Sequence, residues 1–340
     1  MSEKVAKKAR KRGLKTWSAF GNLGRRPTEY EILTHNMNHT TGEIPLEMGP
    51  DVHGNAWLRE HRDSMPLREI AWDDFRDPDT LTYGSYVASQ DDQETYIEYL
   101  LEQFDSEGYD EKLNDEQIAL LRNAITPTRY VGHAQQMLSA YLQQLAVSSY
   151  VANCAAFQTA DQLRRVQTIA YRTTQLKLAH PEKGFATGEK SDWTDKPLWQ
   201  PIREAFEWAL VEFDWDRAFV VTNLVVKPIA DRLFLSEAGL QLARIGARLD
   251  SLIAENLYND SERSRRWSAE LVTFVTKADQ AHLATLQSYL DDWVERGEAM
   301  IEAGAALLAS PSGRDADTIA ADVRKDWHGS LVAVGLSATR

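Results

Sequence analysis

A continuous helical pattern of apolar residues runs from residue 129 to residue 178, without a proline and without a glycine after Gly132. Two long helices are therefore predicted there. One face of the first carries Tyr130, Ala134, Met137, Leu138, Tyr141 and Leu145. One face of the second carries Val151, Ala155, Val166, Ile169, Thr173 and Leu176. At about 100° per residue, Gln162 falls at the middle of that second face, so a polar group occupies a position where a hydrophobic core is expected.

Three polar side chains, Gln158, Gln162 and Arg165, share this inward face at positions i, i+4 and i+7. They are expected to form a hydrogen-bonded polar plug, in which Arg165 pairs with a carboxylate on the following helix such as Glu204 or Glu207. The alternative is that Arg165 extends to solvent while Gln162 bonds a backbone carbonyl. Both arrangements satisfy the polar groups, and the pattern alone does not choose between them.

Most of the remaining chain also has helical periodicity. Further helices are expected over 92–104, 115–125, 202–213, 218–234, 237–258, 260–276 and 280–308, with a long loop over 180–201. The segment 218–234 is apolar almost all round and is placed at the centre, with a kink at Pro228. No strand with alternating apolar and polar residues is evident. The sequence predicts an all-α antiparallel bundle over residues 81–310, followed by a C-terminal tail over 311–340.

The first 80 residues have a different character. Lysine and arginine crowd the first fifteen positions, as Lys4, Lys7, Lys8, Arg10, Lys11, Arg12 and Lys15. Five prolines then interrupt residues 17–80. We expect residues 1–80 to form an extended arm that wraps a partner subunit, because such a long irregular segment is unusual inside a compact domain. The expected interface residues are Trp17, Arg25, Arg26, Tyr30, Trp57 and Trp72. The alternative for the basic stretch is a solubilising tail.

Composition narrows the class of protein. A hydrophobic share of 43% is that of a folded globular chain, and a net charge of −13 argues against nucleic acid as a principal partner. The lone cysteine, Cys154, excludes an internal disulfide and is expected to be a small buried side chain in a cytoplasmic protein. No apolar run of about eighteen residues occurs, so no membrane span is expected.

The sequence contains no recognisable catalytic or metal-binding motif. A carboxylate-bridged di-iron site in a helical bundle needs Glu-x-x-His pairs on facing helices. None of the eight histidines has a glutamate three positions earlier, and the closest approach is His282 with Asp279. The chain also contains no phosphate-binding Gly-x-x-x-x-Gly-Lys-Ser/Thr loop and no Gly-x-Ser-x-Gly nucleophile elbow. No catalytic residue and no metal ligand is therefore predicted in this chain.

Several ordered segments carry a resemblance to a known family. They are KTWS at 15–18, RRPTEYEI at 25–32, FRDPDTLTYGSYVASQDDQETYIEYLLEQF at 75–104, QMLSAYLQQLA at 136–146, QTADQLRR at 158–165, NLVVKP at 223–228 and DSERSRRWS at 260–268. Through them the chain resembles the β subunits of the hydroxylase component of bacterial multicomponent di-iron monooxygenases, in the four-component toluene and alkene (isoprene-type) branch. The resemblance implies a ferritin-like bundle similar to the catalytic α subunit but without its metal ligands.

The resemblance also bears on the polar plug. DQLRR looks like a degenerate copy of the Asp-Glu-Leu-Arg-His signature of the α subunits, with Gln162 at the glutamate position and Arg165 at the histidine position. Glutamine is a poor ligand, and arginine cannot coordinate a cation. The second α motif corresponds to Glu262 and Arg265, with a solvated surface glutamate as the other interpretation of Glu262.

The function implied by the resemblance is that of a non-catalytic structural β subunit of an oxygenase that hydroxylates or epoxidises an alkene or aromatic hydrocarbon with O2 and NADH-derived electrons. Its implied partners are two copies each of α and a small γ subunit, a regulatory protein, a Rieske-type ferredoxin and a reductase. The di-iron centre would belong to α, and this chain would hold no cofactor. The alternative is a self-contained ferritin-like enzyme or ligand-binding protein with its own cofactor.

Overall fold

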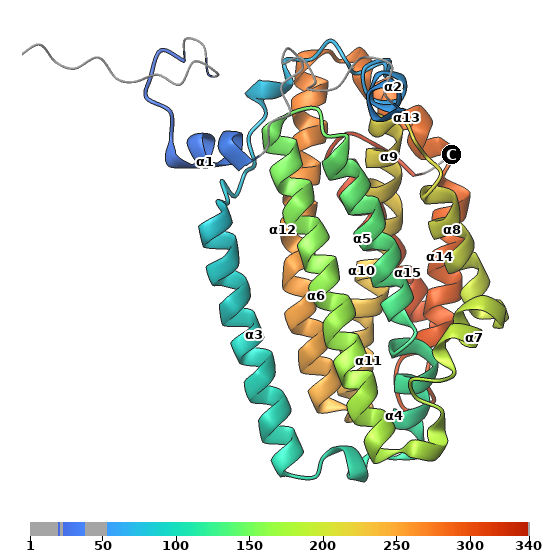
Figure 1. Cartoon of the computed structure of the whole chain (residues 1–340). Helices are drawn as coiled ribbons and strands as arrows, with labels where there is room; N and C mark the ends of the chain where they lie inside the picture. Colours follow the sequence, from blue (N-terminus) through green and yellow to red (C-terminus); the bar gives the residue numbers. More distant parts are fainter. Residues whose placement is uncertain (1–19, 21–22, 38–52, 339–340) are drawn as a thin grey trace, which may run out of the picture.

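The computed structural model describes residues 20, 23–37 and 53–338, and within these ranges every regular element is helical (Figure 1). Four antiparallel helical segments form the centre. They are α5 (Thr128–Gln144), α6 (Ser149–Ala179), a composite segment made of α9 (Trp215–Phe219), α10 (Lys227–Asp231) and α11 (Ala238–Arg244), and α12 (Arg248–Ala278). The all-α bundle predicted from the sequence is confirmed.

The other helices surround this centre. They are α1 (Glu29–Met37), α2 (His53–His61), α3 (Tyr83–Ser106), α4 (Asp115–Leu120), α7 (Glu189–Asp195), α8 (Gln200–Ala209), α13 (Ala281–Asp291), α14 (Val294–Leu308) and α15 (Ala316–Val332). Figure 1 shows α3 standing on one side of the bundle, while α7, α8 and α14 lie on the other. No helix in the described ranges is long and apolar enough to cross a membrane.

Side chains at the N-termini of α3 and α6 explain where these two helices begin. Thr82 and Ser85 form a capping box at the start of α3, and the Ser148 side chain accepts a hydrogen bond from the backbone N–H of Val151 at the start of α6. Gly132 allows α5 and α6 to approach closely, since a Cβ there would lie 3.1 Å from the Val166 side chain. These two helices therefore pack as one tight layer.

The central composite helix is buried on nearly every side, as its apolar sequence predicts. It continues past Pro228 by changing its hydrogen-bond pattern, because residues 220–226 and 232–237 are π-helical and flank α10. Pro228 has no N–H to offer the carbonyl of Leu224 four residues earlier. The indole of Trp327 donates to that carbonyl at 2.7 Å instead.

A tryptophan indole also hydrogen-bonds the carbonyl four residues before a second proline, Pro127. Pro127 cannot donate to the carbonyl of Asn123, which lies in the π-helical segment 121–125, and the indole of Trp199 donates to it at 3.2 Å. Both tryptophans are fully buried. Proline interruptions inside the bundle are thus compensated by tryptophans from other helices, which keeps the carbonyls hydrogen-bonded.

Some predicted boundaries were wrong. The loop predicted over 180–201 contains α7, and the helix predicted over 237–258 is divided by a turn at Gly246, whose φ is +80°. Helix α12 then runs without a break from Arg248 to Ala278. Residues predicted as a C-terminal tail include α15, which belongs to the bundle because one of its faces is buried in the core. That face consists of Ile319, Val323, Trp327 and Leu331.

Candidate functional site

The centre of the bundle holds a buried charged cluster around Asp231 of α10. Its carboxylate accepts hydrogen bonds from Arg165 of α6 at 3.0 Å, from Ser261 of α12 at 2.9 Å and from Gln135 of α5 at 3.3 Å. Lys227, one turn earlier on α10, completes the contacts. Each of the four central segments therefore contributes a polar side chain to one carboxylate, and we call these five residues the Asp231 cluster.

The cluster carries two positive charges and one negative charge. Burial by itself raises the pKa of Asp231, but the Lys227 and Arg165 charges outweigh burial and hold that pKa below its usual value. Burial lowers the pKa of Arg165, and Asp231 opposes that shift. The two cations and the carboxylate are mutually dependent, since each would be costly to bury alone.

A second polar group continues the column along α6. Gln158 donates to Ser139 at 2.9 Å and exchanges hydrogen bonds with Asn223 of the π-helical segment 220–226. Asn223 also donates to Ser268 of α12 at 2.9 Å. Gln158 and Arg165 are thus hydrogen-bonded inside the core as predicted, but the plug is not continuous, because the buried amide oxygen of Gln162 has no hydrogen-bond partner among the described residues.

The predicted partner of Arg165 was wrong. Glu204 is exposed on α8, and Glu207 pairs at the surface with Arg203. The alternative, in which Arg165 extends to solvent, is also wrong because its side chain is only 2% exposed. The sequence pattern identified the inward face of α6 but gave no indication that the apolar central helix carries the compensating Asp231.

Helices α6 and α12 exchange a second pair of ionic contacts next to the cluster. Arg164 of α6 binds Asp260 of α12 at 3.0 Å, and Arg263 of α12 binds Asp161 of α6 at 2.5 Å. Tyr86 of α3 donates to Asp161 at 2.9 Å. Burial, followed by the nearby Asp260 charge, raises the pKa of Asp161 to about 7, with Arg263 opposing the shift.

These reciprocal contacts show that both helices carry the same Asp-x-x-Arg pattern, Asp161 to Arg164 and Asp260 to Arg263. In this register Gln162 corresponds to Ser261, and Arg165 corresponds to Ser264. Both serines are buried. The repeated Asp-x-x-Arg spacing is visible in the sequence, and it could have identified Ser261 and Ser264 as the inward-facing residues of α12.

The resemblance placed the second α-subunit motif at Glu262 and Arg265 of α12, and the structure corrects this assignment. Glu262 is exposed, and Arg265 points toward α15, where it binds Asp326 at 2.5 Å. Neither contacts the Asp231 cluster. The inward-facing residues of α12 are Ser261 and Ser264, because Glu262 and Arg265 each lie one position beyond the face that α12 turns to α6.

The cluster does not have the donor set of a di-iron site. Such a site uses several carboxylates and histidines from facing helices. Here Asp231 is the one carboxylate, Gln135 is a neutral amide, and two cations occupy the space beside the carboxylate. No group of three or more potential His, Cys, Asp or Glu ligands occurs in the described part of the chain.

The predicted interface residues divide into two groups. Tyr30 and Trp72 are buried in this chain's own core, and Trp57 is partly buried, donating to the Tyr141 hydroxyl at 3.0 Å. Arg25 and Arg26 remain exposed, although Arg25 also binds Glu31 at 2.7 Å. Trp17 lies outside the described residues.

Anchoring by Tyr30 and Trp72 to a partner was therefore a wrong prediction, since the folded chain covers these rings itself.

The lone thiol behaves as predicted. Cys154 is buried, and burial raises its pKa well above the usual value.

Comparison with known proteins adds independent information. Residues 57–279 match the family model described as methane/phenol/alkene hydroxylase. Over 302 residues the chain is 34% identical to the hydroxylase component subunit beta of the toluene-4-monooxygenase system of Ectopseudomonas mendocina, which covers 88% of this chain and 92% of that protein. It is 27% identical to the hydroxylase component small subunit of propane 2-monooxygenase from Mycolicibacterium goodii, over 49% of this chain and 48% of that one.

Comparison with solved structures also finds hydroxylase chains. A chain of toluene 4-monooxygenase, with toluene bound in its resting active site, superimposes with a TM-score of 0.81 at 34% identity, covering 88% of this chain and 99% of that one. A chain of phenol hydroxylase from Pseudomonas sp. OX1 also has a TM-score of 0.81, at 19% identity over 99% and 98% of the two chains. The second likeness shows the fold alone.

Proposed function

The chain belongs to the methane/phenol/alkene hydroxylase family, as a hydroxylase subunit of a multicomponent monooxygenase, and from this premise we propose that it is the structural, non-catalytic subunit of its complex. The relatives named above are components for toluene and propane oxidation. We extend to this chain the oxygenation of an aromatic or alkene hydrocarbon, carried out by O2 and NADH-derived electrons at a di-iron centre in a partner catalytic subunit.

The observation that carries the non-catalytic role is the donor set of the Asp231 cluster. Where facing helices of a ferritin-like bundle can place carboxylates and histidines around metal ions, this chain places Arg165 and Lys227 around one carboxylate. Fixed side-chain cations balance Asp231 inside the bundle. The electrostatic demand of the buried carboxylate is then met without a metal, and the four helices are held together by the contacts to it.

The proposed complex contains the catalytic α subunit and a small γ subunit, two copies of each together with this chain, served by a regulatory protein, a Rieske-type ferredoxin and a reductase. The relatives support this because they are hydroxylase components of multi-protein systems. In such a complex this chain contributes rigidity and docking surface rather than reacting groups.

Metal analysis tests the proposal. The chain, purified alone and reconstituted anaerobically with ferrous iron, is expected to retain far less than one iron per polypeptide, while the co-purified complex with its catalytic subunit retains iron under the same treatment. Stoichiometric iron in the isolated chain, with the absorption of an oxo-bridged centre, would contradict the non-catalytic role and favour a self-contained ferritin-like enzyme.

A further inference from the structure

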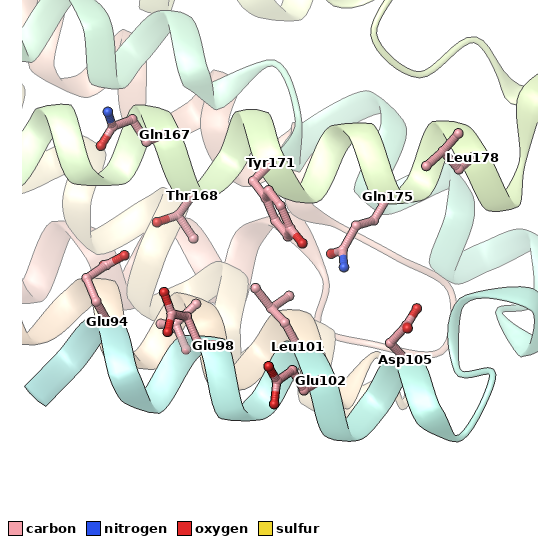
Figure 2. A pocket seen from close by; sticks show the side chains of 11 residues that line it. Glu94, Glu98, Leu101, Glu102, Asp105, Gln167, Thr168, Tyr171, Gln175 and Leu178 are labelled. Atoms are coloured by element: carbon pink, nitrogen blue, oxygen red, sulfur yellow. The ribbon is translucent and has the colours of Figure 1, made fainter.

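A groove runs between α3 and α6 on the outside of the bundle, with a volume of about 570 Å³. Figure 2 shows its two walls, with acidic side chains and Leu101 from α3 on one side and Tyr171, Gln175 and Leu178 from α6 on the other. Helix α3 is held to the bundle along one face, where Tyr86, Ile97 and Leu100 are buried and the side chains of Tyr86, Gln90, Gln93 and Glu94 bond to α6 and α12. Much of a 24-residue helix is thus free to contact another molecule.

The wall formed by α3 is negatively charged. Glu98, Glu102 and Asp105 line the groove at positions i, i+4 and i+7, which places them along about 10 Å of one helix face. None of the three has a cationic partner within the described residues, whereas Glu94 at the end of the row binds Arg164. A row of unpaired carboxylates attracts lysine and arginine from a partner.

The wall formed by α6 combines polar and apolar side chains, namely Gln167, Thr168, Tyr171, Gln175 and Leu178. Tyr171 and Leu178 of this wall are 58% and 78% exposed, and Leu163, outside the groove but further along the outer side of α6, is 48% exposed, so the three, the apolar stripe of α6, span about 22 Å of the helix. Met137 on the adjacent α5 is also exposed. Large apolar side chains gathered on one face of a soluble protein mark an interaction surface.

We infer that this α3–α6 face is the docking surface for the catalytic subunit, which would insert a helix or strap bearing Lys or Arg against Glu98, Glu102 and Asp105 and cover the apolar stripe of α6. The inference rests on the proposed function and adds the location and chemistry of the subunit contact. A charged groove next to an apolar stripe has the polar and apolar parts that stable interfaces combine.

The basic first fifteen residues of this chain are the other occupant to consider. They have the right charge, but Val5 and Leu14 are their only large aliphatic side chains after Met1. Two such side chains cannot cover Leu163, Tyr171, Leu178 and Met137, which are spread over two helices. A folded partner surface fits both the acidic row and the apolar stripe.

Charge reversal tests the acidic wall in the co-expressed complex. The triple variant Glu98→Lys, Glu102→Lys, Asp105→Lys is compared with Asp92→Lys, Glu204→Lys, Glu255→Lys, which makes the same change in net charge at exposed positions outside the groove. We expect the groove variant to reduce co-purification with the catalytic subunit at least tenfold and the control variant to leave it unchanged.

Three other outcomes overturn the inference, each in a distinguishable way. Equal, undiminished yields for both variants place the contact elsewhere while the proposed function stands. Equal losses attribute the effect to net charge rather than to the groove. A wild-type chain that does not assemble with the catalytic subunit removes the proposed function and this inference with it.

Photo-crosslinking identifies the occupant directly. The photoreactive amino acid p-benzoylphenylalanine is incorporated at the position of Tyr171, with Leu240, an exposed residue outside the groove, as the control position. A crosslink from position 171 to a Lys- or Arg-bearing peptide of the catalytic subunit is expected, and none from position 240 to that peptide. A crosslink from position 171 to residues 1–15 of this chain, or to another segment of a second copy, overturns the assignment.

Discussion

At the residue scale, the charges of the Asp231 cluster do not balance. Asp231 supplies one negative charge, and Arg165 and Lys227 supply two positive charges. Removing Arg165 therefore leaves a neutral Lys227–Asp231 pair, whereas removing the Asp231 charge leaves two buried cations facing each other. The roles of these side chains are not equivalent, and substitution distinguishes them.

Asp231→Asn is expected to cost about 3–5 kcal/mol of unfolding free energy, because it breaks a buried ionic contact and leaves charge uncompensated. Arg165→Met, which nearly preserves side-chain volume, is expected to cost clearly less. Denaturant unfolding of the assembled complex measures both. If Arg165→Met destabilised as strongly as Asp231→Asn, the charge count would not describe the cluster.

A second residue predicts pH dependence. Asp216 is buried, receives a hydrogen bond from the Tyr289 hydroxyl at 3.3 Å and lies near Asp214. Burial raises its pKa from the usual 3.8 to about 6. Between these two values the folded state binds more protons than the unfolded state, so this carboxyl makes stability fall as pH rises from about 4 to about 6.

Asp216→Asn should therefore leave stability near pH 4 almost unchanged and raise it at pH 7 relative to wild type by about 2–3 kcal/mol, since one pKa unit corresponds to 1.36 kcal/mol. Melting curves from pH 4 to pH 7 measure the difference. The exposed Asp92→Asn serves as the control. Parallel pH profiles for wild type and Asp216→Asn would show that this carboxyl does not titrate in the window.

At the scale of elements, the central composite helix depends on helices that cross it. Its carbonyl at Leu224, which cannot receive a hydrogen bond from residue 228 because Pro228 has no N–H, is hydrogen-bonded by Trp327 of α15. The buried Trp267 of α12 offers a natural comparison, because its indole N–H has no hydrogen-bond partner among the described residues. The two tryptophans are equally buried but differ in this one contact.

Trp327→Phe is expected to destabilise the chain by about 0.5–1.5 kcal/mol more than Trp267→Phe, because it removes the hydrogen bond from the indole to the Leu224 carbonyl. Both substitutions remove a similar volume, so the difference isolates the hydrogen bond. Thermal melting with matched denaturant titrations measures it. Equal destabilisation by the two variants would mean that the Leu224 carbonyl is satisfied in another way.

At the scale of the whole molecule, the amino-terminal region divides into two parts. Tyr30 and Glu31 of α1 belong to the folded body, since Tyr30 packs on Tyr150 and the buried Glu31 binds both Arg25 and Arg76. The basic residues within the first fifteen positions are the part still proposed to bind a partner subunit. A truncation must separate these two parts to be informative.

Deleting residues 1–19, which keeps the Phe20 ring packed on His35 of α1, is expected to leave the melting temperature of the chain unchanged while reducing the yield of its complex with the catalytic subunit. Deleting residues 1–37 removes Tyr30 and Glu31 as well, and is expected to lower the melting temperature. Circular dichroism and co-purification measure the two effects. An undiminished yield after the shorter deletion would identify the basic stretch as a solubilising tail.

Hydrophobic periodicity by itself determined that this chain is an all-α bundle, that α5 and α6 form its central pair and that Gln158, Gln162 and Arg165 face inward. These features follow from the order of residues within one helix, because side-chain direction is fixed by the helical repeat. The ordered motifs also indicated the family, which the comparisons show.

Only the tertiary structure decided which groups meet. It paired Arg165 with Asp231 rather than Glu204, placed Ser261 and Ser264 rather than Glu262 and Arg265 on the inward face, and buried Tyr30 and Trp72 in the chain's own core. Periodicity gives the direction of a side chain relative to its own helix axis. It does not give the rotation and axial offset of one helix against another, and those two quantities determine which charge lies opposite which.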